Sequence, residues 1–165
     1  MAKRRKKSAG GLPAKGRLRD IADSLWSLAV RADWDDCCAI CGAGKCDAHH
    51  LVPRQHEATR YDIANGIALC RFCHKFNGNY SPHQNAAGFL HWLGFNYPTC
   101  SLWLREHFWP KFDGTKNVAY YLDVLRSLRQ YVEPEEFERI VGVKLARQLD
   151  SALPSPRGCG GVTEW

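Results

Sequence analysis

Apolar residues recur at helical spacing near both ends of the chain. Intervals of three and four predict one amphipathic helix over residues 17–33 and another over 118–132. A proline followed by two glutamates predicts the start of a last helix that covers about 134–149. Aromatic and aliphatic positions between 89 and 108 predict two short helices separated by Pro98. Most of the chain is therefore expected to be helical.

The middle of the chain has a different pattern, with short β-compatible segments between turns. Residues 47–52 alternate loosely and stop at Pro53, and residues 65–70 form a second short apolar segment at an Asn-Gly turn signal. A helix or turn is expected from residue 71, with Gly78 as its C-cap. The order predicted here is strand, loop, strand and helix.

Charge is distributed unevenly and distinguishes the N-terminal end. The formal net charge is +6, but residues 1–19 contain eight basic residues and no acidic one, which leaves 15 basic and 17 acidic residues elsewhere. A polybasic segment with Gly and Pro cannot bury apolar area, and it is typical of disordered arms that bind nucleic acid. A solubilising tail is the alternative. The cations expected to bind DNA are Lys3, Arg4, Arg5, Lys6 and Lys7.

Neither an export signal nor a membrane span is expected. No apolar segment follows the basic start, and no apolar run approaches the ~20 residues that cross a bilayer. We therefore expect a cytoplasmic location and no membrane partner. Cysteines are reduced in such a compartment, where Cys-x-x-Cys pairs are typical of metal binding.

The strongest chemical signal consists of four cysteines in two Cys-x-x-Cys pairs. They are Cys38, Cys41, Cys70 and Cys73. Two thiolates three residues apart on a turn can bind one ion, and two such pairs complete a tetrahedral, closed site for structural Zn²⁺. Cys37 and Cys46 compete by proximity, although Cys37 leaves a three-residue gap and Cys46 stands alone.

The segment between the two pairs contains adjacent histidines, His49 and His50. Neighbouring strand residues point to opposite faces, so the two imidazoles suit different tasks, one as a metal ligand and one as a base. His74 follows the second cysteine pair and can reach back over the strands. Asn65 precedes the second strand, and its amide can fix a loop because it both donates and accepts hydrogen bonds.

This order of residues resembles a known family. His-His-x-x-Pro, then Asn, then Cys-x-x-Cys-His is similar to the HNH endonucleases, which have a ββα-metal fold. The similarity covers roughly residues 37–78. A looser similarity to phage recombination nucleases of the NinG type covers about 20–95, through "LWSLAVRADWDDCCAICG", "RYDIANGIALCRFCH" and "SPHQNAAGFLHWL". If the chain is phage-encoded, its location is the host cytoplasm.

The resemblance implies a role for each matching residue. His50 corresponds to the general base that activates water, and Asn65 to the asparagine that fixes the loop and the base. His49 and His74 correspond to ligands of a catalytic divalent ion, which is Mg²⁺ or Mn²⁺, with Ni²⁺ and Zn²⁺ as alternatives. Arg54 and Arg60, in the loop between the strands, are expected to bind DNA phosphates.

Several remaining residues are assigned to packing or turns. We expect a surface or packing role for His83, with an approach to the metal as the alternative. Asp62 is expected to cap the turn before Asn65, with orientation of a histidine as the alternative. A set of aromatic residues at helical spacing is expected in the core. These residues are Trp92, Phe95, Trp103, Phe108 and Trp109.

The sequence thus predicts an α+β fold, with a small ββα-metal core stabilised by zinc and flanked by α-helices. The expected organisation is a disordered basic arm (1–16), a nuclease core with its N-terminal helix and zinc site (17–80), a helical region (81–150) and a flexible tail (151–165). The expected function is metal-dependent hydrolysis of phosphodiester bonds in duplex or branched DNA, by nicking or cleavage. The alternative is a zinc-stabilised DNA-binding or recombination accessory protein without nuclease activity.

Overall fold

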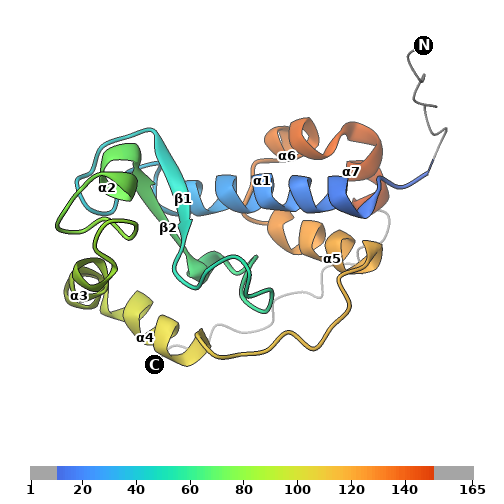
Figure 1. Ribbon diagram of the computed structural model, residues 1–165. Helices are drawn as coiled ribbons and strands as arrows, with labels where there is room; N and C mark the ends of the chain where they lie inside the picture. The colour runs from blue at the N-terminus through green and yellow to red at the C-terminus, as the bar shows by residue number, and fades with distance from the viewer. Residues whose placement is uncertain (1–10, 151–165) are drawn as a thin grey trace, which may run out of the picture.

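The computed structural model describes residues 11–150. Within that range the chain forms seven α-helices and one two-stranded antiparallel sheet (Figure 1). The predicted α+β class is confirmed at this level. Most of the predicted arm and all of the predicted tail lie outside the described residues.

Helix α1 (Lys15–Asp33) runs through the middle of the molecule and joins its two halves (Figure 1). Its apolar stripe is buried as predicted, and the helix begins two residues earlier than expected. The stripe consists of Leu18, Ile21, Ala22, Leu25, Trp26, Ala29 and Val30. A Cβ added at Gly66 would lie 2.2 Å from a methyl carbon of Val30, so glycine allows the sheet to approach this helix closely.

One half of the molecule is a helical bundle on α1. It contains α5 (Val118–Arg129), α6 (Pro134–Val141) and α7 (Val143–Asp150). Their apolar faces form a core with α1 that includes Leu125, Leu128 and Phe137. The prediction of one helix over 134–149 is wrong, because Gly142 has φ of +89° and ends α6 before α7 begins.

The other half contains the sheet and the shorter elements that surround it. These are β1 (Cys46–His50), the 3₁₀ helix η1 (Ile63–Asn65), β2 (Gly66–Cys70), α2 (Arg71–Lys75), α3 (Ala86–Asn96) and α4 (Pro98–His107). In the sheet, Cys46 pairs with Cys70 and His50 pairs with Gly66. The predicted strand, loop, strand and helix order is confirmed, but α2 ends at Lys75, so Gly78 is not its C-cap.

The helices that follow residue 80 pack on both halves of the molecule. α3 packs against the cysteine-containing part through Phe89 and Leu93, whereas α5, α6 and α7 pack on α1. Three of the five expected core aromatics are exposed, Phe95 at 84%, Trp109 at 80% and Phe108 at 37%. Phe95 lies on the side of α3 opposite to Phe89 and Leu93, and Trp109 lies beyond the end of α4.

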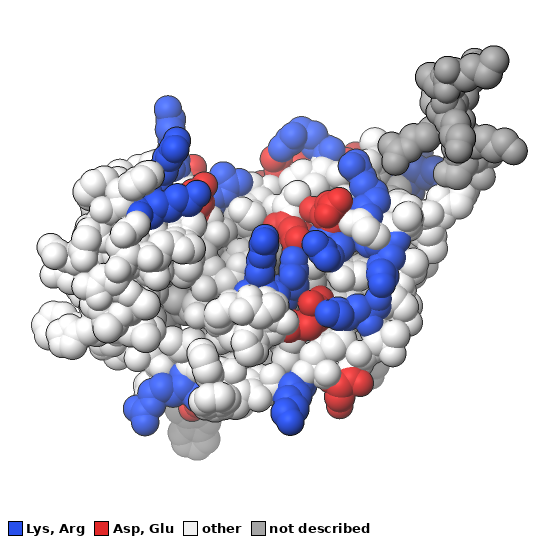
Figure 2. Space-filling view, viewed as in Figure 1, with Lys and Arg blue, Asp and Glu red and all other residues white. Residues whose placement is uncertain are grey.

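Charged side chains are distributed unequally over the two halves. Figure 2 shows Lys, Arg, Asp and Glu gathered over the helical bundle, while much of the other half presents uncharged residues on the same face. Among the helices of residues 11–150, none has both the length and the apolar composition needed to cross a membrane.

Candidate metal centres

The four predicted cysteine ligands come together in space. The sulfur atoms of Cys38, Cys41, Cys70 and Cys73 all lie within 4.8 Å of one another. Zn–S bonds of about 2.3 Å in a tetrahedron place sulfurs ~3.8 Å apart, and the Sγ atoms of Cys41 and Cys70 are 3.7 Å apart. The cluster therefore fits a structural metal such as zinc.

Local backbone geometry brings each pair of cysteines together. Gly42 has φ of +73°, and its N–H donates to the Cys38 carbonyl, which closes the first turn. Cys70 is the N-cap of α2, and its sulfur accepts a hydrogen bond from the backbone N–H of Cys73. A strand that runs directly into a helix thus places the second pair opposite the first.

Thiol ionisation is favoured at one position of this cluster. Burial opposes ionisation of Cys38, but hydrogen bonds from the backbone of Cys70, Cys41 and Ile40 outweigh it and lower its pKa to about 7. A lowered thiol pKa favours the thiolate, which is the form that binds metal.

The two competing cysteines do not join the cluster. The Cys46 thiol instead donates a hydrogen bond to the Ala43 carbonyl, and burial raises its pKa to about 11. Cys37 is exposed and lies outside the group of four. The geometry therefore favours the ligand set that the Cys-x-x-Cys spacing predicted.

A second cluster consists of three histidines. The metal-binding nitrogens of His49 on β1, His74 on α2 and His83 before α3 lie within 4.8 Å of one another. His49 Nδ1 and His83 Nε2 are each 3.1 Å from His74 Nε2. Zn–N bonds of about 2.0–2.1 Å in a tetrahedron place nitrogens ~3.4 Å apart. The three rings are thus arranged as ligands of one ion would be.

Hydrogen-bond partners determine which nitrogen of His74 can bind a metal. His74 Nδ1 lies 3.4 Å from a carboxylate oxygen of Asp47. A carboxylate only accepts, so Nδ1 carries the proton and Nε2 presents its lone pair to the other two rings. A carboxylate behind a ligating histidine is common at metal sites, where it orients the ring.

Burial favours the neutral form of His49 and His74 in this cluster. Burial, together with the neighbouring His74 and His83, lowers the pKa of His49 to about 3. Burial also lowers the pKa of His74. Neutral imidazole is the metal-binding form, so burial favours coordination at neutral pH.

His83 is exposed, in keeping with the expected surface position, and its ring also joins the histidine cluster, which was the alternative for this residue. Its position depends on Ser81, whose buried hydroxyl donates to the His74 carbonyl at 2.7 Å and accepts from the backbone N–H of His83 at 3.2 Å. This turn brings His83 back over α2. The spacing of His74 and His83 matches no common ligand motif. Ser81, as a turn residue, was the one local feature in the sequence that could have indicated the return of His83 towards His74.

His50 faces a different environment from its neighbour, as the strand geometry predicted. Its Nε2 donates to the Arg60 carbonyl at 3.0 Å, which leaves Nδ1 with a free lone pair. The ring stacks on Trp26 of α1, with centroids 3.6 Å apart and planes 13° apart. Burial lowers the pKa of His50 to about 4, so the ring is neutral at pH 7.

Asn65 fixes the loop that holds His50. Its side chain is fully buried, and its Oδ1 accepts from the Val52 N–H at 2.6 Å. Its Nδ2 donates to the carbonyls of Val52 and Thr59. Asn65 therefore positions the loop up to residue 60, whose carbonyl holds the His50 ring. Asp62 caps the same turn by accepting from the Ala64 N–H, as predicted.

The two predicted phosphate-binding arginines differ in the structure. Arg60 is unsuited to that task, because its side chain is only 9% exposed and its guanidinium donates to both carboxylate oxygens of Asp23 at 2.7–3.1 Å. It also donates to the Arg54 carbonyl. The Arg54 side chain is exposed and lines a cavity of about 600 Å³ together with His49, His50, His74 and His83.

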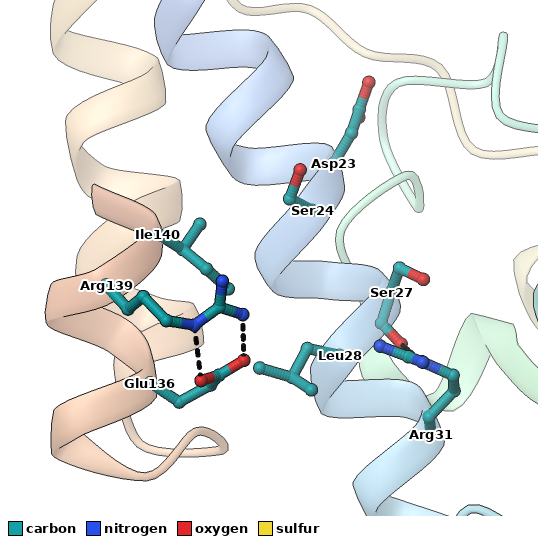
Figure 3. A pocket seen from close by; sticks show the side chains of 8 residues that line it. All are labelled: Asp23, Ser24, Ser27, Leu28, Arg31, Glu136, Arg139 and Ile140. Carbon is teal, nitrogen blue, oxygen red and sulfur yellow. Dashed lines mark hydrogen bonds and ion pairs between the residues drawn. The ribbon is translucent and has the colours of Figure 1, made fainter. Parts of the chain in front are cut away.

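Another hollow lies between α1 and α6, away from both clusters. Figure 3 shows its polar lining, in which the carboxylate of Glu136 and the guanidinium of Arg139 pair on the same helix. It contains neither the cysteines nor the histidines. The Asp23 carboxylate in this hollow is already paired with Arg60, so it is not a free acid or base for catalysis.

Comparison of the chain with family models, with curated proteins and with solved structures finds no match. The chemistry of the two clusters must therefore indicate the function. The cysteine set has the four ligands of a closed site, whereas the histidine set has three ligands and opens into the cavity. Three protein ligands with an open position are typical of metal sites that act on a substrate.

Proposed function

We propose that the chain is a metal-dependent DNA endonuclease of the HNH type. The observation that carries this proposal is the convergence of His49, His74 and His83 beside His50 in one cavity. His49, His50 and His74 come from a strand, loop, strand and helix unit whose second strand and helix also supply two of the clustered cysteines, and His83 lies in the segment that follows this helix. The strand–helix order and the residues at matching positions support a ββα-metal core.

His50 is the proposed general base. Its Nε2–H donates a hydrogen bond to the Arg60 carbonyl, so Nδ1 is the atom that accepts a proton from water. As that proton leaves, the water oxygen bonds to phosphorus and the bond from phosphorus to the leaving oxygen breaks. Stacking on Trp26 and the loop fixed by Asn65 hold the ring in place, so little reorganisation is needed.

His49, His74 and His83 would hold the divalent cation. When bound, the cation supplies a Lewis acid that stabilises negative charge on the phosphate oxygens. Three imidazole ligands favour Mn²⁺, Ni²⁺ or Zn²⁺ over Mg²⁺, which prefers oxygen ligands. The third histidine therefore shifts our expectation towards a transition metal.

DNA is the proposed substrate because the basic residues suit a polyanion. Arg54 lies at the cavity with an exposed side chain that can bind a phosphate. The sequence also supplies eight basic residues and no acidic one before residue 20. One cavity of this kind cuts one strand, so nicking is the expected primary activity.

The direct test is nicking of supercoiled plasmid by the full chain with Mn²⁺, Ni²⁺, Zn²⁺ or Mg²⁺ added separately. His50→Ala is expected to lower the rate by ~10²–10⁴-fold, the usual cost of removing a general base, while metal binding measured by calorimetry is unchanged. His91→Ala is the matched control, because His91 is an exposed histidine on α3 outside the cluster. Absence of nicking by the unaltered chain with every metal would contradict the proposal.

A further inference from the structure

A group of aromatic rings lies beside the histidine cavity, where α4 ends. Phe108 and Trp109 pack edge to face, with ring centroids 4.8 Å apart. The imidazole of His56 lies 6.2 Å from the Phe108 ring. His56 comes two residues after Arg54, which lines the cavity. The group formed by His56, Phe108 and Trp109, here called the aromatic rim, is connected to the proposed active site through His56, which directly follows Gln55 of the cavity lining.

The exposure of the aromatic rim is not explained by folding. Trp109 is 80% exposed and Phe108 is 37% exposed, although burial of such rings is strongly stabilising. The Phe108 ring supports one edge of the indole, and Pro110 restricts the backbone of Trp109. An indole that is both exposed and held in place presents a flat, polarisable surface to a ligand.

The charges around the rim favour an anionic ligand. Arg105 and Lys111 flank it in sequence, and both side chains are exposed. No ion pair involving either is found among the described residues, and the only acidic residue between them is Glu106. Exposed aromatics combined with cations are the usual means of binding single-stranded nucleic acid, in which base faces are free to stack.

We propose that Trp109, supported by Phe108, stacks on an unpaired base of the DNA strand that enters the histidine cavity. This inference rests on the proposed endonuclease function and adds a substrate class to it. A continuous duplex hides its base faces, so the rim favours single-stranded or branched DNA. Loss of one stacked base is expected to weaken binding about 10-fold.

The test measures binding of fluorescein-labelled oligothymidylate of about 15 nucleotides, within the usual range of such sites, and of a blunt duplex of equal length. The full chain carries His50→Ala so that the probes are not cut. Trp109→Ala and Trp109→Phe are compared with Phe95→Ala, the matched control, because Phe95 is 84% exposed and lies outside the rim. Circular dichroism verifies that every variant is folded.

The inference predicts that Trp109→Ala weakens single-strand binding about 10-fold and leaves duplex binding unchanged. Trp109→Phe should retain most of the affinity, and Phe95→Ala all of it. Equal loss on both probes, no loss on either, or the same loss with Phe95→Ala would overturn the inference. Plasmid nicking is measured separately with His50 intact. If the unaltered chain nicks plasmid but Trp109→Ala binds the single strand normally, only the proposed stacking site is refuted. If Trp109→Ala weakens single-strand binding but the unaltered chain does not nick plasmid, only the proposed endonuclease function is refuted.

Discussion

The cysteine cluster and the histidine cluster share one short helix but have different surroundings. Cys73 and His74 are adjacent on α2, yet the first contributes to a group of four sulfurs and the second to a group of three nitrogens. The sulfur group offers four ligands, the number that a closed zinc site uses. The nitrogen group borders a cavity of about 600 Å³ and has a hydrogen-bonded carboxylate behind it.

Under our proposal, this difference distinguishes a metal site that stabilises the fold from one that acts on a substrate. The sheet half of the molecule buries a small core of eight residues, three of which are cysteines, whereas the helical half buries fourteen. A small core needs the added stability of a metal. A metal held by the cysteine cluster would supply that stability and fix α2. In our proposal the histidine cluster then holds a second metal through three ligands, which leaves one coordination position for substrate.

The largest effect is expected from breaking the cysteine cluster with Cys73→Ser. Zinc binding at such sites is worth about 10–16 kcal/mol in apparent free energy, and it is coupled to folding. The variant should lose zinc and unfold the sheet half. Metal analysis and circular dichroism provide the measurement, with His74→Ala as the neighbouring control. A folded, zinc-free Cys73→Ser protein would show that the cysteines have no structural role.

A smaller effect is expected from His83→Ala, which removes one of three nitrogen ligands. Affinity for Mn²⁺ or Ni²⁺ should fall by more than the ~10–100-fold typical of losing an outer-sphere partner, while zinc content and the unfolding temperature remain unchanged. Titration calorimetry on zinc-loaded protein measures this affinity. Unaltered binding would mean that the ring lies near the ion without coordinating it.

The smallest effect is expected from Asp47→Asn, which alters only the residue behind His74. The asparagine can still accept a hydrogen bond but lacks the negative charge that makes the ligand more basic. The Asp47 side chain is 57% exposed, so we expect metal affinity to fall by about 10-fold, the lower end of the usual range. Asp47→Ala should lower the metal affinity further, because alanine cannot accept the hydrogen bond from His74. The same loss with Asp36→Asn, an exposed acidic residue outside the cluster, would show that Asp47 acts only through net charge.

Local sequence patterns predicted the parts of the site that are close in sequence. The Cys-x-x-Cys pairs, the alternation of His49 and His50 and the histidine after Cys73 each depend on neighbours within a few residues. The helices with clear apolar stripes, α1 and α5, were predicted for the same reason.

Features that depend on distant residues were missed. Arg60 was predicted to bind phosphate, but its partner Asp23 lies 37 residues earlier in the chain. His83 reaches His74 only through the Ser81 turn. The break at Gly142 was missed because the apolar spacing continues across it, although its backbone conformation ends the helix. Propensity and spacing carry no information on such tertiary contacts.

The most direct test of two metal sites with different tasks is metal content and plasmid nicking measured on the same samples. Protein saturated with Mn²⁺ or Ni²⁺ is dialysed against a mild chelator, then assayed before and after the metal is restored. Our account predicts that nicking disappears with the histidine-bound metal, that about one zinc per chain remains, and that nicking returns on addition of the metal. Nicking that persists with only the cysteine-bound zinc present would contradict it.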